Sequence, residues 1–333
     1  MLYNYSLLPH NTFGMNARAA QFAEYDSTDA LAALLRDPAV ASRPMLHIGA
    51  GSNLLFTADY DGTILHSAIR FIRIERESAD EVWVRVGSGV VWDDFCAWAV
   101  AQGLYGAENL SYIPGEVGAS AVQNIGAYGV EVCDLIDEVE LMEVATQQLL
   151  RVAGSACGYG YRQSRIKGEW KGRYIVTSVL YRLSKKPAFK LDYGNLRASL
   201  EGRELTAEAV REAVIAIRRS KLPEPSEQGN AGSFFMNPVI ERAHYEALLA
   251  DYPDMPHYDV DADRVKVPAA WLIDRCGWKG RGVGGAAVHD RQCLVIVNRG
   301  HATAQDVMDL ASAVAASVKE RYGIEISPEV NYI

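Results

Sequence analysis

Two glycine-rich segments carry the residues best suited to hold an anionic ligand. The first runs from a short apolar stretch into Gly49, Gly51, Ser52 and Asn53, and then returns to apolar residues. Glycine lets backbone N–H groups approach an anion closely, and serine and asparagine add side-chain hydrogen bonds. Leu54 stands where the dinucleotide fingerprint GxGxxG needs its third glycine, so this is a different motif. Taken alone, the segment is more simply explained by a tight turn between strands.

The second segment, residues 113–129, has a backbone covered by few large side chains. An ordinary loop would be more polar, so this composition favours close approach by a flat or phosphate-bearing ligand. Gln123 and Asn124 would add side-chain donors. The small residues of the segment are Gly115, Gly118, Ala119, Ser120, Ala121, Gly126 and Gly129.

Three further residues have side chains that could act on a bound substrate. Ser233 follows Gly232, but Phe235 stands where the hydrolase motif GxSxG needs a glycine. A serine in this setting is more often a capping or turn residue. Arg162 and Glu329 are single charged residues among apolar or aromatic neighbours, and such residues usually form surface ion pairs. Spacing alone therefore assigns none of the three a role.

The elements that would position these residues are helices and strands mixed along the chain. Ser27 is expected to cap a helix that buries Leu31, Leu34 and Leu35. Apolar spacing predicts further helices, and alternating or continuous apolar runs predict strands. The fold class is therefore α+β or α/β. The other predicted helices cover 91–102, 206–220 and 303–323, with Thr303 and Asp306 as a capping pair, and the predicted strands cover 82–87, 174–182 and 293–297.

The composition is that of a globular protein with an acidic balance. The chain has 333 residues, with 33 Lys+Arg against 42 Asp+Glu, a net charge of −9. This charge argues against broad nucleic-acid binding. No apolar run approaches the ~18 residues of a membrane span, and the N-terminus lacks a signal-peptide pattern. The five cysteines and seven histidines show no CxxC, HxH or HExxH spacing, so we expect reduced thiols, no metal site and a cytoplasmic protein.

Taken together and in order, the motifs resemble those of the UDP-N-acetylenolpyruvoylglucosamine reductase family of bacterial cell-wall synthesis. The resemblance runs nearly end to end, and the ordered set is far more specific than any one motif. The matching segments are Asn11–Met15, Gly49–Leu55, Ile113–Glu131, Tyr161–Ser164, Lys221–Pro223, Gly229–Phe235, Ala270–Asp274, Gly285–His289 and Pro328–Val330.

The resemblance implies an α+β flavoprotein of the vanillyl-alcohol-oxidase/PCMH type with an added α+β substrate domain. FAD would be bound without a covalent link, and NADPH would be the co-substrate. The breaker-rich stretch after Ser220 is the best candidate for a domain boundary. The implied domains are residues 1–66 and 67–220 for FAD, 221–323 for substrate, and a C-terminal segment, 324–333, that carries Glu329.

The implied reaction reduces the enolpyruvyl group of UDP-N-acetylenolpyruvoylglucosamine. Arg162 would hold the substrate carboxylate, Ser233 would donate a proton, and Glu329 would act from the other side as a hydrogen-bond donor. We expect a monomer with no nucleic-acid or membrane partner. The implied FAD-binding residues are Gly49, Ala50, Gly51, Ser52, Asn53, Pro114, Gly115, Gly118, Ala119, Ser120, Gln123, Asn124 and Gly126. The implied substrate-binding residues are Tyr193, Lys221, Asn237, Tyr258, Lys266, Lys279 and Gln292, with Tyr258 on a loop that covers the site.

The sequence departs from the family pattern at two positions, and two alternative functions would share part of that pattern. Met236 stands where many relatives have lysine, and Ala121 replaces a common proline. A related FAD oxidase of another small substrate would share the flavin segments but need not keep Ser233, Arg162 and Glu329. A sugar-nucleotide-binding protein without flavin would lack yellow FAD absorbance. We also expect Gly51→Val to expel FAD, because a β-branched side chain would fill the path along which the ligand approaches and would disfavour a positive φ.

Overall fold

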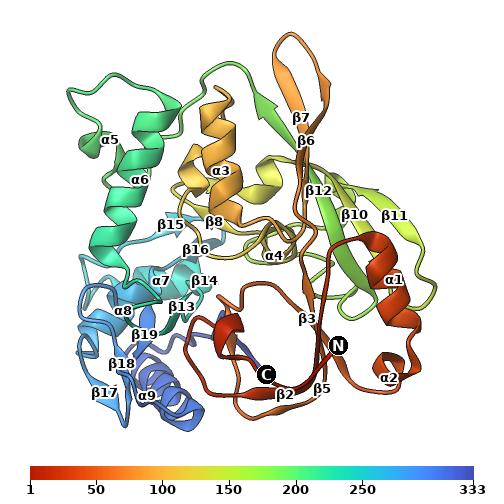
Figure 1. Ribbon diagram of the computed structural model, residues 1–333. Coiled ribbons are helices and arrows are strands. Elements are labelled where there is room, and N and C mark those ends of the chain that lie inside the picture. Colours follow the sequence, from red (N-terminus) through yellow and green to blue (C-terminus); the bar gives the residue numbers. More distant parts are fainter. The chain divides into compact units, whose positions relative to one another are not determined.

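The computed structural model describes residues 1–333, which divide into two compact units (Figure 1). Each is described here by itself. The domain limits expected from the sequence remain predictions. No helix has the length and apolar character needed to cross a membrane. Unit 1 comprises Met1–Tyr5, Ala19–Ala50 and Tyr60–Ser220, and unit 2 comprises Ser6–Arg18, Gly51–Asp59 and Lys221–Ile333.

A four-stranded sheet with a parallel centre forms the first layer of unit 1. Its strand order is β1-β2-β5-β3, and β2 and β3 both run parallel to β5. Ser27 caps α1 by accepting a hydrogen bond from the N–H of Ala30 at 3.2 Å, which confirms the predicted cap. Leu31 and Leu35 are buried and Leu34 is half-buried. The elements are β1 (Leu2–Ser6), β2 (Arg18–Tyr25), α1 (Thr28–Arg36), α2 (Pro38–Ala41), β3 (Met45–Ile48) and β5 (Tyr60–Ser67).

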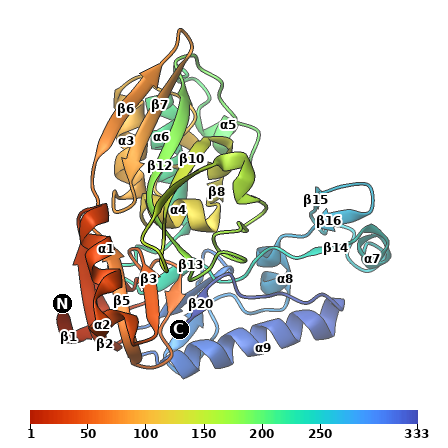
Figure 2. The same ribbon diagram turned by 90° about the vertical axis from the view of Figure 1, so that its right-hand side faces the viewer.

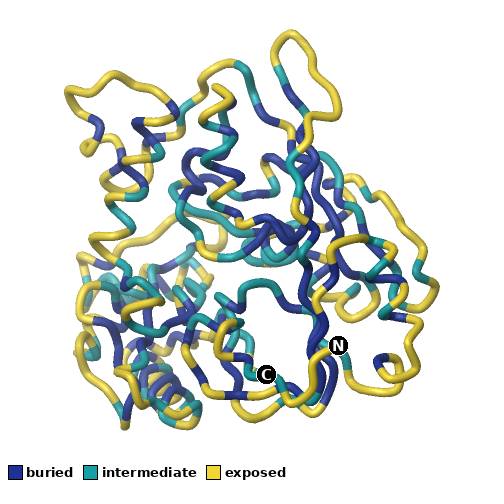
Figure 3. The backbone as a smooth tube through the Cα atoms, viewed as in Figure 1, coloured by how far each residue is buried: buried dark blue, intermediate teal, exposed yellow.

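A five-stranded antiparallel sheet and two helices enclose the main core of unit 1. The strand order is β11-β10-β12-β7-β6. Trp92, Phe95 and Ala99 of α3 are buried, together with Val117 and Ala121 of α4. These side chains pack with the apolar face of the sheet, while the hairpin tip of β6 and β7 is exposed (Figure 3). The elements are β6 (Ile72–Glu77), β7 (Glu81–Gly87), α3 (Trp92–Ala101), α4 (Val117–Gln123), β10 (Ile136–Glu143), β11 (Leu149–Ala153) and β12 (Tyr174–Ser184).

A line of charged and polar groups crosses the same sheet and fixes its register. The Arg85 side chain on β7 is only 2% exposed. It donates to Glu75 on β6 at 2.8 Å and to Glu138 on β10 at 2.6 Å. Because a buried guanidinium is costly without partners, a strand slip that broke these pairs would be strongly disfavoured.

Shorter elements complete unit 1. Helix α6 confirms the helix predicted over 206–220, with Val210, Ala213 and Val214 buried. It packs against the residues around α5 in a small core of its own. The elements are β8 (Gly126–Ala127), β9 (Val130–Glu131), α5 (Leu196–Ser199) and α6 (Ala207–Lys221), with 3-10 turns at Glu108–Leu110, Val132–Asp134 and Gly154–Cys157.

Unit 2 is built around the long helix α9, which packs against β17, β18 and β19 (Figure 2). Thr303 and Asp306 form the predicted capping box, and Gly323 ends the helix with a positive φ. The strand predicted over 293–297 begins later, at Val295, because the chain is still turning where Val295 donates to the carbonyl of Gln292. The first elements are a 3-10 turn (Leu8–His10), β4 (Leu54–Leu55), β13 (Asn230–Ser233), β14 (Val239–Glu241), α7 (Arg242–Leu248) and β15 (Tyr258–Asp259). The remaining elements are β16 (Arg264–Lys266), α8 (Ala269–Arg275), β17 (Gly282–Val283), β18 (Ala286–Val288), β19 (Val295–Asn298), α9 (Ala304–Tyr322) and β20 (Asn331–Tyr332).

Candidate active site

The turn after β3 offers backbone donors that the protein does not use. Within the first glycine-rich segment, the N–H groups of Ala50, Gly51 and Asn53 donate to no other protein group. In the second segment the same holds for Gly115, Glu116 and Ala119. Unpaired backbone donors are expensive unless water or a ligand satisfies them. Their concentration in these two segments is typical of an anion-binding backbone.

The glycines of these segments let parts of the protein approach one another. A Cβ on Gly49 would lie 3.1 Å from Glu116 Oε2 and 3.4 Å from Ala119 Cβ. A Cβ on Gly118 would lie 2.9 Å from the Cβ of Ser88. Gly49 and helix α4 therefore lie side by side in unit 1, and their glycines keep that packing tight.

The structural need for a glycine at position 51 differs from the ligand path that we expected. Its φ is +69°, and a Cβ there would collide with the backbone carbonyl of His10. The space that a side chain would fill therefore belongs to the protein backbone and is no approach path for a ligand. Of our two reasons for the effect of Gly51→Val, the positive φ is confirmed and the open approach path is wrong: any loss of FAD would follow from a distorted turn. The other residues of this turn, Ser52 and Asn53, are half-buried.

In the second segment, some side chains form hydrogen bonds within the protein and others do not. Ser120 donates to the carbonyl of Val117 at 2.7 Å and faces Tyr181 in the core. Gln123 has a buried Oε1 without a partner. An orphaned buried acceptor next to unpaired backbone donors fits a segment that completes its hydrogen bonds with a ligand. Pro114 is exposed at the start of the segment.

Asn124 links this segment to the loop that carries Arg162. Its φ is +46° and it is completely buried. Its Nδ2 donates to Glu131 at 2.9 Å and to the carbonyl of Gly160 at 2.8 Å, and its Oδ1 accepts from the N–H of Cys133. The Asn124 side chain therefore positions the loop and has no donor left for a ligand.

Arg162 lies in a strained turn, with a φ of +56°. The turn is closed by two hydrogen bonds exchanged between Gly160 and Gln163. The guanidinium donates to the carbonyls of Asn124 at 3.2 Å and Gly126 at 2.8 Å. Gly126 permits this approach, since a Cβ there would lie 3.0 Å from Nη1. A non-glycine residue in this conformation is costly and is found most often at functional sites.

In unit 2, Ser233 and Glu329 come from distant parts of the sequence to neighbouring backbone. The segments that follow Ser233 and precede Glu329 meet in an isolated antiparallel bridge between Phe235 and Pro328. Phe234 accepts a hydrogen bond from the N–H of Glu329 at 2.7 Å, and Met236 donates to Ser327 at 3.0 Å. Asn53 adds a third segment, because its Nδ2 donates to the carbonyl of Glu329 at 3.1 Å. Ser233 is exposed and Glu329 is half-buried.

Two of the residues predicted to bind substrate form a pair, and the others are dispersed. Tyr258 and Lys266 lie opposite each other on β15 and β16, with Nζ 5.8 Å from the ring centroid. Asn237 accepts from the N–H of Ala269 at 2.9 Å and so begins α8. Gln292 accepts from the N–H of Leu294. Lys221 and Lys279 are exposed in unit 2, and Tyr193 is exposed in unit 1 with its ring 6.2 Å from that of Tyr128.

One charged side chain near Arg162 was not predicted. Arg218 on α6 donates through Nε to the carbonyl of Tyr112 at 2.9 Å, and its guanidinium has no carboxylate partner. Burial lowers the pKa of Arg218, and the charge of Arg162 lowers it further. Helical spacing places Arg218 outside the apolar stripe of α6, so the sequence alone suggests a solvated surface residue. No motif signal marks it.

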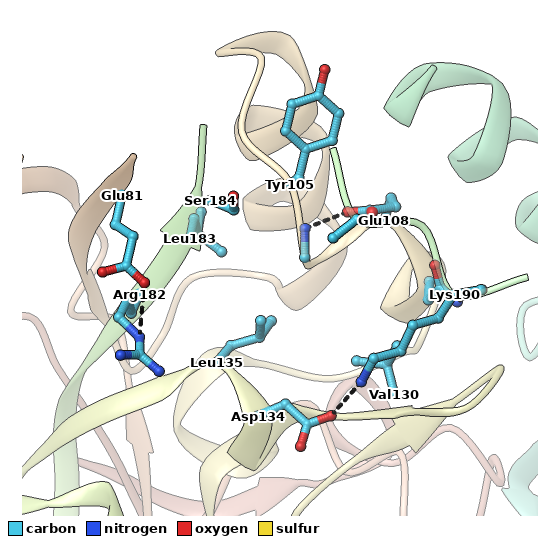
Figure 4. Close-up of a pocket in the computed structure, with 13 residues that line it drawn as sticks. Glu81, Tyr105, Glu108, Val130, Asp134, Leu135, Arg182, Leu183, Ser184 and Lys190 are labelled. Carbon is cyan, nitrogen blue, oxygen red and sulfur yellow. Dashed lines mark hydrogen bonds and ion pairs between the residues drawn. The ribbon is translucent and has the colours of Figure 1, made fainter. Parts of the chain in front are cut away.

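A cavity of about 240 Å³ lies in unit 1 (Figure 4). Its charged side chains satisfy one another: Lys190 pairs with Asp134 at 3.2 Å, and Arg182 with Glu81 at 3.6 Å. Glu108 accepts from the N–H of Gly106 at 2.6 Å. None of the predicted site residues lines this cavity, so we do not regard it as the active site.

Comparison with known proteins identifies the family. The C-terminal domain of UDP-N-acetylenolpyruvoylglucosamine reductase matches residues 224–333, and an FAD binding domain matches residues 19–153. UDP-N-acetylenolpyruvoylglucosamine reductase of Bacteroides fragilis strain YCH46 is 55% identical over 334 residues, covering 100% of both chains. The chain belongs to the UDP-N-acetylenolpyruvoylglucosamine reductase family. The resemblance found in the sequence is thereby confirmed.

Solved structures agree with this family's fold. The UDP-N-acetylenolpyruvylglucosamine reductase of Thermus caldophilus has a TM-score of 0.69 at 22% identity, covering 98% of this chain and 97% of that one. The 4-ethylphenol oxidase of Gulosibacter chungangensis has a TM-score of 0.54 at 13% identity, with 97% and 84% covered. The predicted α+β fold of the vanillyl-alcohol-oxidase/PCMH type, with an added C-terminal domain of the reductase family, is thus confirmed.

Proposed function

We propose that this FAD-dependent enzyme reduces the enolpyruvyl group of UDP-N-acetylenolpyruvoylglucosamine, giving UDP-N-acetylmuramate with NADPH as the electron source. The observation that carries this proposal is the identity of 55% with a reductase of that name over the whole chain. The site geometry supports it, because Ser233 and Glu329 lie on paired backbone segments of unit 2. The reaction makes a peptidoglycan precursor.

The two glycine-rich segments fit FAD. When bound, FAD supplies the hydride chemistry that amino-acid side chains lack. Residues 49–53 and 114–126 would hold it through backbone donors, and the unpaired N–H groups of Ala50, Gly115 and Ala119 support that assignment. The buried, unpartnered Oε1 of Gln123 is a further group that a ligand could satisfy.

Arg162 would bind and polarise the substrate carboxylate. Its planar guanidinium offers donors in a fork that matches a carboxylate, and two carbonyl partners hold that fork in place. When hydride reaches the terminal carbon of the enolpyruvyl group, negative charge develops on the neighbouring carbon and its carboxylate. A fixed cation stabilises that charge as it forms. Glu329 would hold the same carboxylate from the other side, as a donor when protonated.

Ser233 would complete the reaction by proton transfer. Its Oγ–H bond breaks as a new C–H bond forms at the carbon next to the carboxylate, so the double bond becomes a saturated centre. The serine oxygen recovers its proton from solvent. Lys221, Lys279 and Asn237 are the residues proposed to stabilise the serine oxygen before it does so. Tyr193, Tyr258, Lys266 and Gln292 are the residues proposed to contact the sugar nucleotide or NADPH.

A direct assay tests this function. Purified protein should be yellow, and its mixture with NADPH and UDP-N-acetylenolpyruvoylglucosamine should lose nicotinamide absorbance only when all three are present. A colourless protein that binds the sugar nucleotide would support the alternative without flavin. A yellow protein that oxidises NADPH at the same rate without the sugar nucleotide would support the oxidase alternative.

We also propose a cytoplasmic monomer with no nucleic-acid or membrane partner. The acidic net charge of −9 supports the absence of nucleic-acid binding. Sedimentation of the purified protein tests the monomer, since a mass of twice 36.6 kDa would contradict it.

A further inference from the structure

A buried imidazole lies between two carboxylates in unit 1. His66 on β5 is 4% exposed. Its Nδ1 is 2.9 Å from Glu24 Oε2, and its Nε2 is 2.9 Å from Glu116 Oε1. Glu24 comes from β2, and Glu116 immediately precedes α4 in the second glycine-rich segment. The three side chains therefore connect the parallel sheet to a segment proposed to bind FAD.

The position of this triad in the fold points to a ligand. Glu24, His66 and Ile48 lie at the carboxyl ends of β2, β5 and β3, which run parallel. Ligands in sheets of this kind bind beyond the carboxyl ends of the strands. The second oxygen of Glu116, Oε2, lies 3.1 Å from the point that a Cβ on Gly49 would occupy. The Glu116 carboxylate thus separates His66 from the glycine turn.

Four titratable side chains of unit 1 lie around His66. Glu24 and Glu116 are its two carboxylate partners. Burial lowers the pKa of His47, on β3, to about 4, and the charge of His66 lowers it too, so His47 is neutral near pH 7. Tyr25, on β2, lies 2.6 Å from His47 Nε2, and burial raises its pKa. Protonation of His66 therefore adds one positive charge to the triad.

The environment of His66 favours its protonated form. Burial by itself lowers the pKa of His66, but the hydrogen bonds and charges of Glu116 and then Glu24 outweigh it and raise that pKa above 6.5. The protonated form of His66 is therefore favoured below about pH 6.5, and the proton is lost as the pH rises through the raised value.

We propose that His66 is a positioning residue for FAD: it holds the Glu116 carboxylate against the sheet and neutralises its charge beside the flavin-binding backbone. This inference rests on the flavin site of the proposed function. The diphosphate of FAD brings negative charge to the N–H groups of Ala50, Gly115 and Ala119. A Glu116 carboxylate without its imidazolium partner repels that charge, so flavin is retained less tightly when His66 is neutral. Roughly a 10-fold change in affinity is expected from one charge about 10 Å away at an effective dielectric constant of about 20.

The experiment follows FAD release from the holoenzyme. Wild type, His66→Gln, Glu116→Gln and the exposed control His301→Gln are each diluted in series, and the fluorescence of released FAD gives the dissociation constant from about pH 6 to about pH 9. The dissociation constant of wild type and of His301→Gln should rise roughly 10-fold with pH. Glutamine at 66 can still donate to Glu116 but cannot titrate, so His66→Gln should show the weak binding of the high-pH limb at every pH. Glu116→Gln should lose most of the pH dependence and, at high pH, bind FAD more tightly than wild type.

The outcomes separate this inference from the proposed function. A wild type whose FAD affinity does not change with pH overturns the inference, as does a His66→Gln enzyme that keeps the wild-type pH profile. Should His66→Gln fail to fold, Glu116→Gln decides alone, and an unchanged pH profile in that variant overturns the inference. A wild type that never contains FAD contradicts the proposed function instead.

Discussion

The glycine-rich segments proposed to bind flavin and the bridged segments of unit 2 are built from different kinds of chemical group. In unit 1 the available groups are backbone N–H donors, such as those of Ala50 and Ala119, made accessible by small residues. In unit 2 the groups are the side chains of Ser233 and Glu329, whose backbone segments are joined by an antiparallel bridge. Backbone donors can hold an anion but cannot transfer a proton. The difference teaches that cofactor binding and proton transfer should respond to different substitutions.

Ser233→Ala should have the largest effect and should separate the two functions most sharply. Reduction of the flavin by NADPH needs no serine proton, so it should survive, whereas reoxidation of the flavin by the enolpyruvyl sugar should slow ~10²–10⁴-fold. That corresponds to roughly 2.7–5.4 kcal/mol of barrier. Stopped-flow flavin absorbance measures both steps: bleaching with NADPH, and anaerobic recovery with substrate.

Two results would contradict the role given to Ser233. Recovery within a few-fold of wild type would mean that Ser233 is only a turn residue. Failure of the bleaching step would mean that Ser233 acts in cofactor or NADPH binding. Because Ser233 is exposed, its folding cost should stay within about ±0.5 kcal/mol, which a thermal melt can check.

The same difference explains what the sequence could predict. A bare backbone requires small residues at adjacent positions, so the flavin segments are visible as local composition. The helix caps of Ser27 and Thr303 are local in the same way, and both are present. The start of β19 at Val295 could not be foreseen, because a turn competes with an apolar run that looks like strand.

Contacts between distant parts of the sequence were not predictable from spacing. Ser233 and Glu329 become neighbours only through the pairing of Phe234 with Glu329. The sequence suggested both residues through family resemblance and not through physical reasoning. The contact of Glu116 with His66 was missed for the same reason, as was the contact of Gly51 with the His10 backbone, since no local pattern marks any of them.

Arg162→Lys should have the next largest effect, on substrate reduction alone. Lysine keeps the charge but cannot offer a planar fork to a carboxylate. Losing one charge-assisted hydrogen bond costs about 1.5–3 kcal/mol, or roughly 10–100-fold in kcat/KM for the enolpyruvyl sugar. Flavin content should stay at the wild-type level. Steady-state rates measure substrate reduction, and flavin absorbance measures flavin content. Unchanged kcat and KM would mean that Arg162 only holds the carbonyls of Asn124 and Gly126.

Gly118→Ala should affect flavin retention, the function proposed for the glycine-rich segments. The added Cβ would lie 2.9 Å from the Cβ of Ser88 and push α4 away. Overpacking of this kind costs about 1–3 kcal/mol. FAD should be released more readily, while the rate per bound flavin changes little. Gly168→Ala is the matched control, because its nearest neighbour would be the Ser164 carbonyl at 3.5 Å. Equal flavin affinity in the two variants would argue against the role of α4.

Thr303→Ala should have the smallest effect and should leave both functions untouched. Thr303 Oγ1 accepts from the N–H of Asp306 at 3.1 Å, and the Asp306 carboxylate accepts from the N–H of Thr303 at 2.9 Å. Removing the hydroxyl breaks one half of this capping box and costs about 1 kcal/mol of stability. Ser27→Ala, which removes the single cap hydrogen bond of α1 in unit 1, should cost no more than that. Urea titration measures both losses. Neither residue lies in the glycine-rich segments or beside Ser233. A fall in flavin content or in kcat for either variant would therefore show that flavin binding and catalysis also depend on helix stability far from these residues.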